Sequence, residues 1–123
     1  MIQVGTNLKI CDNTGAKAVR CFRILRGTKH RYARIGDVIV VSVKEAEPRR
    51  SVKKGEVVRA VIVRQKSPFK LSSGIYLRFD DNAAIILEGK TKDPKGNRLN
   101  GPIPQILREK GFEKIVGIAN IVV

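Results

Sequence analysis

The chain has 123 residues, 42% of them hydrophobic, which is enough to fill the core of one domain. It carries 25 Lys and Arg against 11 Asp and Glu, a formal net charge of +14. A domain this basic repels itself unless a polyanion neutralises it. We therefore expect one domain over residues 1–123 and a polyanionic partner: a nucleic acid, an anionic membrane surface or a glycan.

Several classes lose support at once. No apolar run approaches the ~20 residues of a membrane span, and the N-terminal residues resemble neither a signal peptide nor a transit peptide. Without a signal peptide, Cys11 and Cys21 are interpreted as small buried thiols in a reducing compartment, although the sequence leaves a disulfide between them open. A secreted glycan binder is disfavoured, and nucleic acid is the favoured partner.

The first half of the chain consists of short β-type runs between turn signals. A strand containing Leu8 and Ile10 precedes the turn Asp12–Gly15, and a second strand is predicted over Lys17–Leu25. The clearest strands are Asp37–Lys44, entered through Gly36, and Val57–Arg64. In the latter both faces are largely apolar, which predicts a strand covered on both sides, as in a small closed barrel.

The second half continues this pattern and then changes. Strands are predicted over Ile75–Phe79 and Asn82–Leu87, with a turn at Ser72–Gly74 and an exposed loop at Asp93–Asn97. Pro104–Lys110 is predicted to form a short helix capped by Gly111, with Ile106 and Leu107 inward. We expect the apolar tail Ile115–Val123 to return to the barrel as a strand. The predicted fold is mainly β, a small barrel or sandwich.

Catalytic and metal-binding arrangements are weak. The one histidine, His30, lies among Lys29, Arg31 and Tyr32, where an RNA contact or a solvated loop residue is the better interpretation. Asp80 and Asp81 are adjacent, so they favour a turn over an acid/base pair. No His–Cys spacing suits zinc, and no glycine-rich phosphate loop is present. We expect no enzyme activity, no metal and no cofactor.

The basic residues are organised in three groups. The first contains no acidic residue that could offset its repulsion: Arg20, Arg23, Arg26, Lys29, Arg31 and Arg34. The second lies in the loop between the two clearest strands: Arg49, Arg50, Lys53 and Lys54. The third surrounds the next turn: Arg64, Lys66, Lys70 and Arg78. Cationic loops on a rigid barrel can follow phosphates without reading base sequence, although a solvated charged face is the alternative for any single residue.

Aromatic residues are scarce. Phe22 and Phe79 lie in apolar strands and are predicted to be core, which leaves Tyr32 and Phe69 in basic, loop-like surroundings. Proteins that bind single strands usually expose several aromatic rings for stacking. The shortage favours folded RNA, bound through its backbone and shape.

Motifs along the whole chain resemble the universal large-subunit ribosomal protein family fourteen, of the bacterial and organellar type. They include Met1–Gln3, Asp12–Ala16, Arg31–Ala33, Ile35–Asp37, Lys44–Ala46, Ala60–Val63, Gly101–Ile103, Leu107–Arg108 and Lys114–Ile115. The most specific signature places Ser73 and Gly74 ahead of Phe79, Asn82 and Ile86, with Ile85 where the pattern prefers valine.

The resemblance implies a five-stranded β-barrel with a β-hairpin ribbon and short C-terminal helices. It implies a structural constituent of the large ribosomal subunit that binds large-subunit rRNA, forms intersubunit bridges with small-subunit rRNA and neighbours other large-subunit proteins. It also implies a docking surface for a ribosome-silencing factor, at the positions of Arg98 and Lys114. The residues expected to bind rRNA are Asn13, Lys17, Arg20, Arg23, Arg26, Lys29, His30, Arg31, Arg34, Lys44, Arg49, Arg50, Lys53, Lys54, Arg64, Lys66 and Arg78.

Two other classes stay open from the residues alone. A free RNA- or DNA-binding regulatory module fits the composition, and an enzyme would need a partner for His30 that the sequence does not offer. The expected location is the large subunit of a ribosome, in a bacterial cytoplasm or inside a mitochondrion or plastid. No membrane and no small-molecule substrate are expected.

Overall fold

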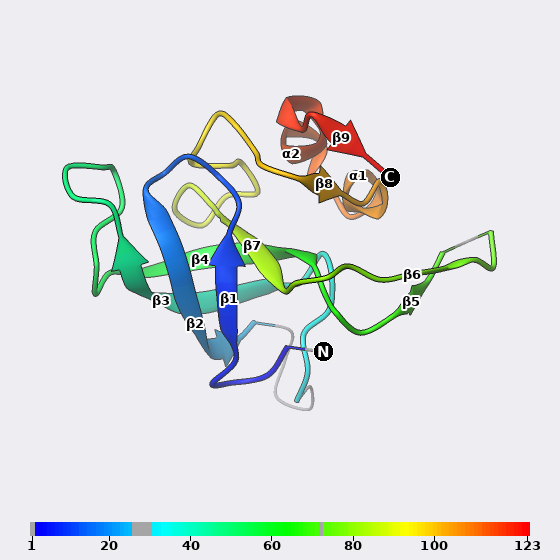
Figure 1. Ribbon diagram of the computed structural model, residues 1–123, viewed down its shortest axis with the longest axis horizontal. Coiled ribbons are helices and arrows are strands. Elements are labelled where there is room, and N and C mark those ends of the chain that lie inside the picture. The colour runs from blue at the N-terminus through cyan, green and yellow to red at the C-terminus, as the bar shows by residue number, and fades with distance from the viewer. Residues whose placement is uncertain (1, 26–30, 72) are drawn as a thin grey trace.

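Five strands close into a barrel in the order β1-β2-β3-β4-β7 (Figure 1). The computed structural model describes residues 2–25, 31–71 and 73–123. The barrel strands are β1 Asn7–Ile10, β2 Ala16–Ile24, β3 Val38–Ala46, β4 Val57–Arg64 and β7 Ala83–Ile86. Neighbouring strands are antiparallel except β1 and β7, which run parallel. The predicted mainly β fold with a five-stranded barrel is confirmed.

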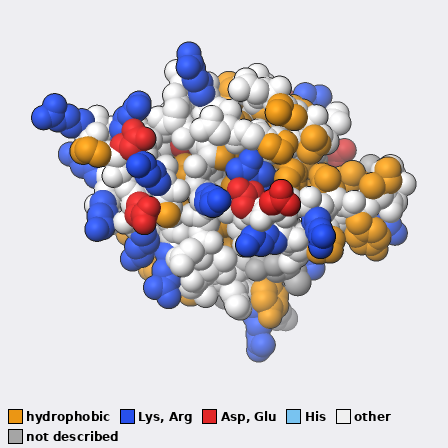
Figure 2. Space-filling model, viewed as in Figure 1, with side chains coloured by type: hydrophobic (Ala, Val, Ile, Leu, Met, Phe, Trp, Pro, Cys, Tyr) orange, Lys and Arg blue, Asp and Glu red, His pale blue; other side chains and the backbone are white. Residues whose placement is uncertain are grey.

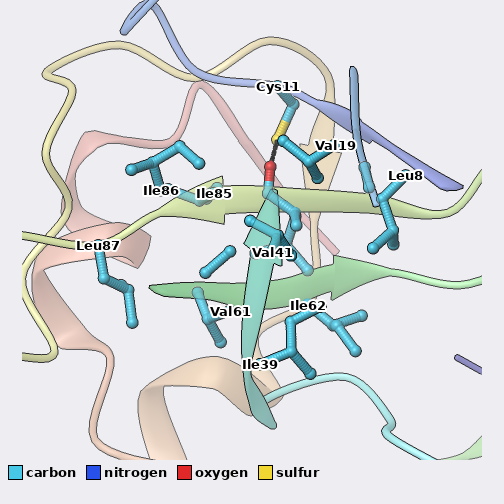
Figure 3. Packing of buried hydrophobic residues seen from close by; sticks show 14 of the residues in the cluster. Leu8, Cys11, Val19, Ile39, Val41, Val61, Ile62, Ile85, Ile86 and Leu87 are labelled. Atoms are coloured by element: carbon cyan, nitrogen blue, oxygen red, sulfur yellow. Dashed lines mark hydrogen bonds between the residues drawn. The ribbon is translucent and has the colours of Figure 1, made fainter. Parts of the chain in front are cut away.

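Branched aliphatic side chains fill the barrel (Figure 3). Cross-strand partners point to the same side of a sheet, so the pairs Leu8–Val19, Cys21–Val41 and Ile39–Ala60 share the inner face. All six side chains are buried. Each large aliphatic side chain removed from water contributes roughly 1.5–3 kcal/mol. Both cysteines are free thiols within this core, as predicted.

The outer face of β4 and β7 is buried too. Val61 and Ile85 are paired across these strands on the face opposite to Ala60, and both are fully buried. The same hydrophobic cluster includes Leu107 and Ile115 of the C-terminal segment, which lies beside β7 in Figure 1. The prediction that β4 is covered on both sides is therefore confirmed, and the C-terminal segment belongs to the cluster that covers it.

A two-stranded ribbon leaves the barrel between β4 and β7. It consists of β5 Phe69–Lys70 and β6 Tyr76–Leu77, which pair antiparallel. The amide of Gly74 donates to the carbonyl of Leu71 at 2.9 Å and forms the predicted turn, although Ser72 lies outside the described residues. The ribbon is confirmed, while β6 is shorter than the predicted strand Ile75–Phe79.

The C-terminal segment corrects one prediction. It forms β8 Pro102–Ile103, the helices α1 Ile106–Glu109 and α2 Glu113–Ile118, and β9 Ile121–Val122. β9 pairs with β8 in a separate two-stranded sheet, so the expectation that Ile115–Val123 joins the barrel as a strand is wrong. Within the tail, Ile115 and Val116 are instead the buried residues of helix α2. The predicted short helices are confirmed.

Two smaller expectations also fail. The loop Asp93–Asn97 is half-buried over most of its length, because the amide of Lys95 donates to the carbonyl of Ile86 at 3.0 Å. Phe22 is 54% exposed, because Val19 and Cys21 take the inward positions of β2. Phe79 does pack against the core, in a partly buried position. Among the described residues, no helix is long and apolar enough to cross a membrane.

Candidate nucleic-acid interface

Strand β2 presents cations on its outer face. Arg20 and Arg23 are exposed, while Val19 and Cys21 are buried between them. The register shifts between Cys21 and Arg23, so Phe22 and Arg23 are exposed side by side. Phe22, which the sequence analysis assigned to the core, is thus an apolar ring flanked by two arginines.

The following loop is anchored by Ala33. Ala33 is fully buried, and it exchanges two backbone hydrogen bonds with Ile2, at 2.6 and 3.0 Å. Arg31 and Arg34 on either side are exposed, and so is Tyr32, at 44%. The remaining residues predicted in this group, Arg26, Lys29 and His30, lie outside the described residues.

The loop between β3 and β4 carries the second group, and Arg49, Arg50, Lys53 and Lys54 are all exposed. In Figure 2, Lys and Arg side chains gather on the left, where Figure 1 places this loop. Val52 anchors the loop, because its side chain is fully buried and its amide donates to the carbonyl of Thr14 at 3.3 Å. The hydroxyl of Ser51 donates to the same carbonyl at 3.1 Å. The loop therefore holds its charges on a fixed backbone.

The turn that receives these bonds depends on the buried carboxyl of Asp12. One oxygen accepts from the amide and hydroxyl of Thr14, at 3.1 and 2.6 Å, and the other from the amide of Ile86, at 2.9 Å. Burial raises the pKa of Asp12 above its ordinary value, and the donors from Thr14 and Ile86 lower it in part. The carboxyl thus connects the end of β1 to β7.

Gly15 lets this turn approach the basic loop closely. Its φ is +101°, and a Cβ at this position would lie 2.2 Å from the Cβ of Arg50. Only glycine adopts this backbone conformation readily and leaves the space. Gly15 therefore allows the Asp12–Gly15 turn to pack directly against the side chain of Arg50.

Asn13, Lys17 and Arg50, distant in sequence, line one cavity of about 550 Å³. The carboxyls of Asp12, Glu45 and Glu47 line it as well. Glu47 lies 3.1 Å from the Nε of Arg50. Charges of both signs meet here, so this cavity does not favour a polyanion as strongly as the exposed loops do. Lys44, near the end of β3, is exposed.

In the third group, Lys66, Lys70 and Arg78 are exposed, but Arg64 is not. Only 9% of Arg64 is accessible, its Nε lies 3.1 Å from Asp81 Oδ1, and its Nη1 donates to the carbonyl of Asn100 at 3.3 Å. A Cβ on Gly101 would lie 2.1 Å from the same Nη1. Although the sequence predicts an RNA contact at Arg64, its position indicates a connection between the barrel and the C-terminal segment.

Arg98 and Lys114 are both exposed. Each is connected to the 93–98 loop. The side-chain oxygen of Asn13 accepts from the amides of Asn97 and Arg98, at 3.0 and 3.3 Å. Lys114 Nζ lies 3.3 Å from Asp93 Oδ2. Asn13, predicted as an RNA contact, therefore also fixes the backbone that carries Arg98.

The described residues offer little for catalysis. Burial raises the pKa of the Cys11 thiol to about 12, so it is a poor nucleophile at neutral pH. Asp81 is paired with Arg64, and Asp80 is exposed beside it. No group of three or more His, Cys, Asp or Glu in the described ranges could hold a metal ion.

A comparison with protein families agrees with the resemblance found in the motifs. The model of one family, ribosomal protein L14p/L23e, matches residues 1–123, the full length of the chain.

Proposed function

We propose that this chain, which belongs to the ribosomal protein L14p/L23e family and so has a structural role in the ribosome, binds large-subunit rRNA directly and has no enzyme activity. The proposed contacts are the exposed cations of β2, the 31–34 loop and the β3–β4 loop, with Lys17, Lys44, Lys66 and Arg78.

The observation that carries the proposal is that most of these cations have no carboxylate beside them in the part of the chain that the structure describes. Three cations there have a carboxylate within 4.0 Å: Arg50 of the proposed set, and Arg64 and Lys114 outside it. The formal charge of +14 therefore remains largely exposed. Phosphates are the anions that a ribosome supplies in excess, and neutralising them releases counterions.

The barrel supplies the geometry. Its exposed arginines stand on paired strands or on loops pinned by Ala33 and Val52, so little backbone order has to be gained on binding. Pre-organised cations bind with a smaller entropic cost. Such a surface suits folded RNA, whose phosphates are themselves fixed in space.

The test is a salt titration of affinity for large-subunit rRNA. If about six to ten phosphates are contacted, the affinity should fall by orders of magnitude as salt is raised several-fold. The double variant Arg49→Gln/Arg50→Gln should bind more weakly and with a shallower salt dependence, because two cations have been removed.

A matched control removes two exposed cations outside the proposed set, in Lys90→Gln/Arg108→Gln. It should keep most of the wild-type affinity and slope. An affinity of the wild type that hardly changes with salt would overturn the proposal, and equal losses in both double variants would remove the β3–β4 loop from the interface.

We further propose that part of this surface contacts small-subunit rRNA across the subunit interface. A cleavage reagent can be tethered at Lys54→Cys or at Lys114→Cys, since the native thiols Cys11 and Cys21 are buried. In joined ribosomes, cuts in small-subunit rRNA from either position support the bridge. Cuts confined to large-subunit rRNA from both positions contradict it.

We also propose that Arg98 and Lys114 form a docking surface for a ribosome-silencing factor. The 93–98 loop supports it, because Asn13 holds the backbone of Arg98 and Asp93 lies beside Lys114. The variant Arg98→Ala/Lys114→Ala should lose the host's factor in a pull-down while still entering ribosomes. Undiminished capture of the factor would contradict this surface.

Finally, we propose that residues 1–123 act as one domain. The single hydrophobic cluster supports it, because it joins barrel residues such as Ile62 to Leu107 and Phe112 of the C-terminal segment. One cooperative unfolding transition, identical by circular dichroism and by exposure of Cys11, is expected. Two separate unfolding transitions would show that the chain contains two domains and would contradict the proposal.

A further inference from the structure

A second cavity is lined by residues of the 31–37 loop, the base of the ribbon and the segment Ile106–Lys110. Its volume is about 410 Å³, within the ~300–1,000 Å³ range of small-ligand sites. Lys110 joins its walls, because its Nζ donates to the carbonyl of Ile35 at 3.1 Å. The cavity is thus a built feature of the fold.

The charged side chains that line this cavity have one sign. Arg34, Lys70 and Lys110 line it, and no Asp or Glu is among the lining residues that the structure describes. The larger cavity beside Asn13 differs, because three carboxyls line it together with its cations. Charge complementarity therefore favours an anionic occupant in the smaller cavity.

Most of the remaining lining is apolar or aromatic, and includes Ile35, Phe69 and Ile106. The ring of Phe69 is held by stacking on Phe79, with centroids 6.4 Å apart and 20° between the ring planes. Apolar surface of this kind would not hold a free phosphate, but it suits a flat ring that carries a negative group.

A buried amide adds polarity to the cavity. Gln65 is 2% exposed, its side-chain oxygen accepts from the amide of Ile35 at 3.1 Å, and its Nε2 donates to the carbonyl of Ser67 at 2.9 Å. These two bonds use the oxygen and Nε2 of the amide within the protein, so Gln65 orders the cavity wall by joining the 31–37 loop to Ser67.

We infer that this cavity takes one unpaired nucleotide of a folded RNA. Its base lies against Phe69 and Ile106, and its phosphates meet Arg34 and Lys70 at the rim. The inference rests on the proposed RNA binding and deepens it, since it adds a pocket for a bulged base to a surface that otherwise follows phosphates. An acidic protein segment is the other class of occupant that such a lining could accept.

The experiment compares two RNA hairpins of the same stem, one perfectly paired and one with a single-nucleotide bulge, each titrated with the full chain. The wild type should prefer the bulged hairpin by about tenfold, the effect of stacking one base. All four bulge bases are tested, so that a preference for one base is not missed.

Two variants assign the preference to the cavity. Phe69→Leu should reduce the preference severalfold while leaving the affinity for the paired hairpin unchanged. Arg34→Gln/Lys70→Gln should weaken binding of the bulged hairpin more than binding of the paired one. The control Lys90→Gln/Arg108→Gln removes two exposed cations that do not line the cavity, so it should keep the wild-type preference. Thermal melts confirm that each variant is folded.

A crosslink supplies a measurement that needs no variant. A 4-thiouridine in the bulge should crosslink to residues 65–70 or 106–110 after irradiation. Crosslinks confined to other segments would overturn the inference.

The outcomes separate the inference from the proposed function. If neither hairpin binds, the proposed RNA binding itself fails. If both bind equally, RNA binding stands and the nucleotide pocket is overturned. If both bind equally and an acidic peptide binds in a manner that depends on Arg34 and Lys70, the cavity belongs to a protein segment and the inference is likewise overturned.

Discussion

Replacing Asp12 with Asn tests how much of the fold depends on one buried carboxyl. Its two oxygens accept three hydrogen bonds, two from Thr14 and one from the amide of Ile86. An Asn side chain keeps one oxygen, which can serve Thr14, but it then directs an NH2 group at the amide of Ile86. Ile86 is fully buried, so no water can replace the lost acceptor.

The expected cost follows from these contacts. A hydrogen bond to a charged group contributes about 1.5–3 kcal/mol, and a buried amide without an acceptor costs about 1–3 kcal/mol. We expect Asp12→Asn to lower the free energy of unfolding by about 3 kcal/mol. For a chain of this length that corresponds to a fall in Tm of about 12 °C.

Thermal unfolding followed by circular dichroism, without RNA, measures the change. Asp80→Asn is the matched control, because Asp80 is exposed, and it should shift Tm by less than about 2 °C. Thr14→Val removes only the hydroxyl bond, so its effect should be intermediate, about 1 kcal/mol. A melt of Asp12→Asn that coincides with that of Asp80→Asn would refute the reasoning.

Two further predictions address Arg64 and the buried thiol of Cys11. Arg64→Met should destabilise the chain by about 1–3 kcal/mol, since it leaves Asp81 unpaired. It should not change the salt dependence of RNA binding, whereas Lys66→Met should reduce the slope of log K against log[salt] by roughly 0.7–0.9. A reduced slope in Arg64→Met would return Arg64 to the interface. Burial raises the pKa of Cys11 from 9.0 to about 12, so above pH 9.0 the unfolded chain loses a proton that the folded chain keeps, and Cys11 should lower the free energy of unfolding by about 1.4 kcal/mol per pH unit. Urea titrations between pH 8 and 10.5 measure this fall. Cys11→Ala should make it shallower, with a remainder from Cys21, whose pKa burial also raises; an equal slope in wild type and variant would contradict the prediction.

The barrel could be predicted from sequence because its signals are local. Val57–Arg64 is apolar on both faces and bounded by turn residues, and its predicted bounds match β4. The structure of the C-terminal tail could not be predicted, because α2 has six residues and β9 has two, and elements this short show no clear hydrophobic periodicity. What determines its structure is pairing with β8 and packing on the barrel, and both are long-range.

Within the proposed interface, the sequence indicated which cations are exposed better than it indicated which are paired. The exposed loops follow from charge, since Lys53 and Lys54 stand next to a turn glycine in a stretch rich in cations. Arg64 has the same charge, and its partner Asp81 is 17 positions away, at a spacing that no sequence rule connects. The one sequence signal that Arg64 would be buried was its place at the end of a strand that is apolar on both faces. Phe22 could have been placed correctly, because Val19 and Cys21 already fix which side of β2 is inward.

The anchoring of the β3–β4 loop explains how so many like charges can be held together when only Arg50 among its four cations has an acidic partner, Glu47. Repulsion among Arg49, Lys53 and Lys54 would push a free loop away from the barrel. Here Val52 is fully buried, and backbone bonds to the 12–15 turn offset the repulsion without neutralising any cation. Further ion pairs like Arg50–Glu47 would also have stabilised the loop, but they would have occupied the charges that the proposed interface needs. The buried carboxyl of Asp12, by ordering that turn, therefore links the stability of the core to the presentation of the cations, and Asp12→Asn should weaken RNA binding even though Asp12 touches no phosphate.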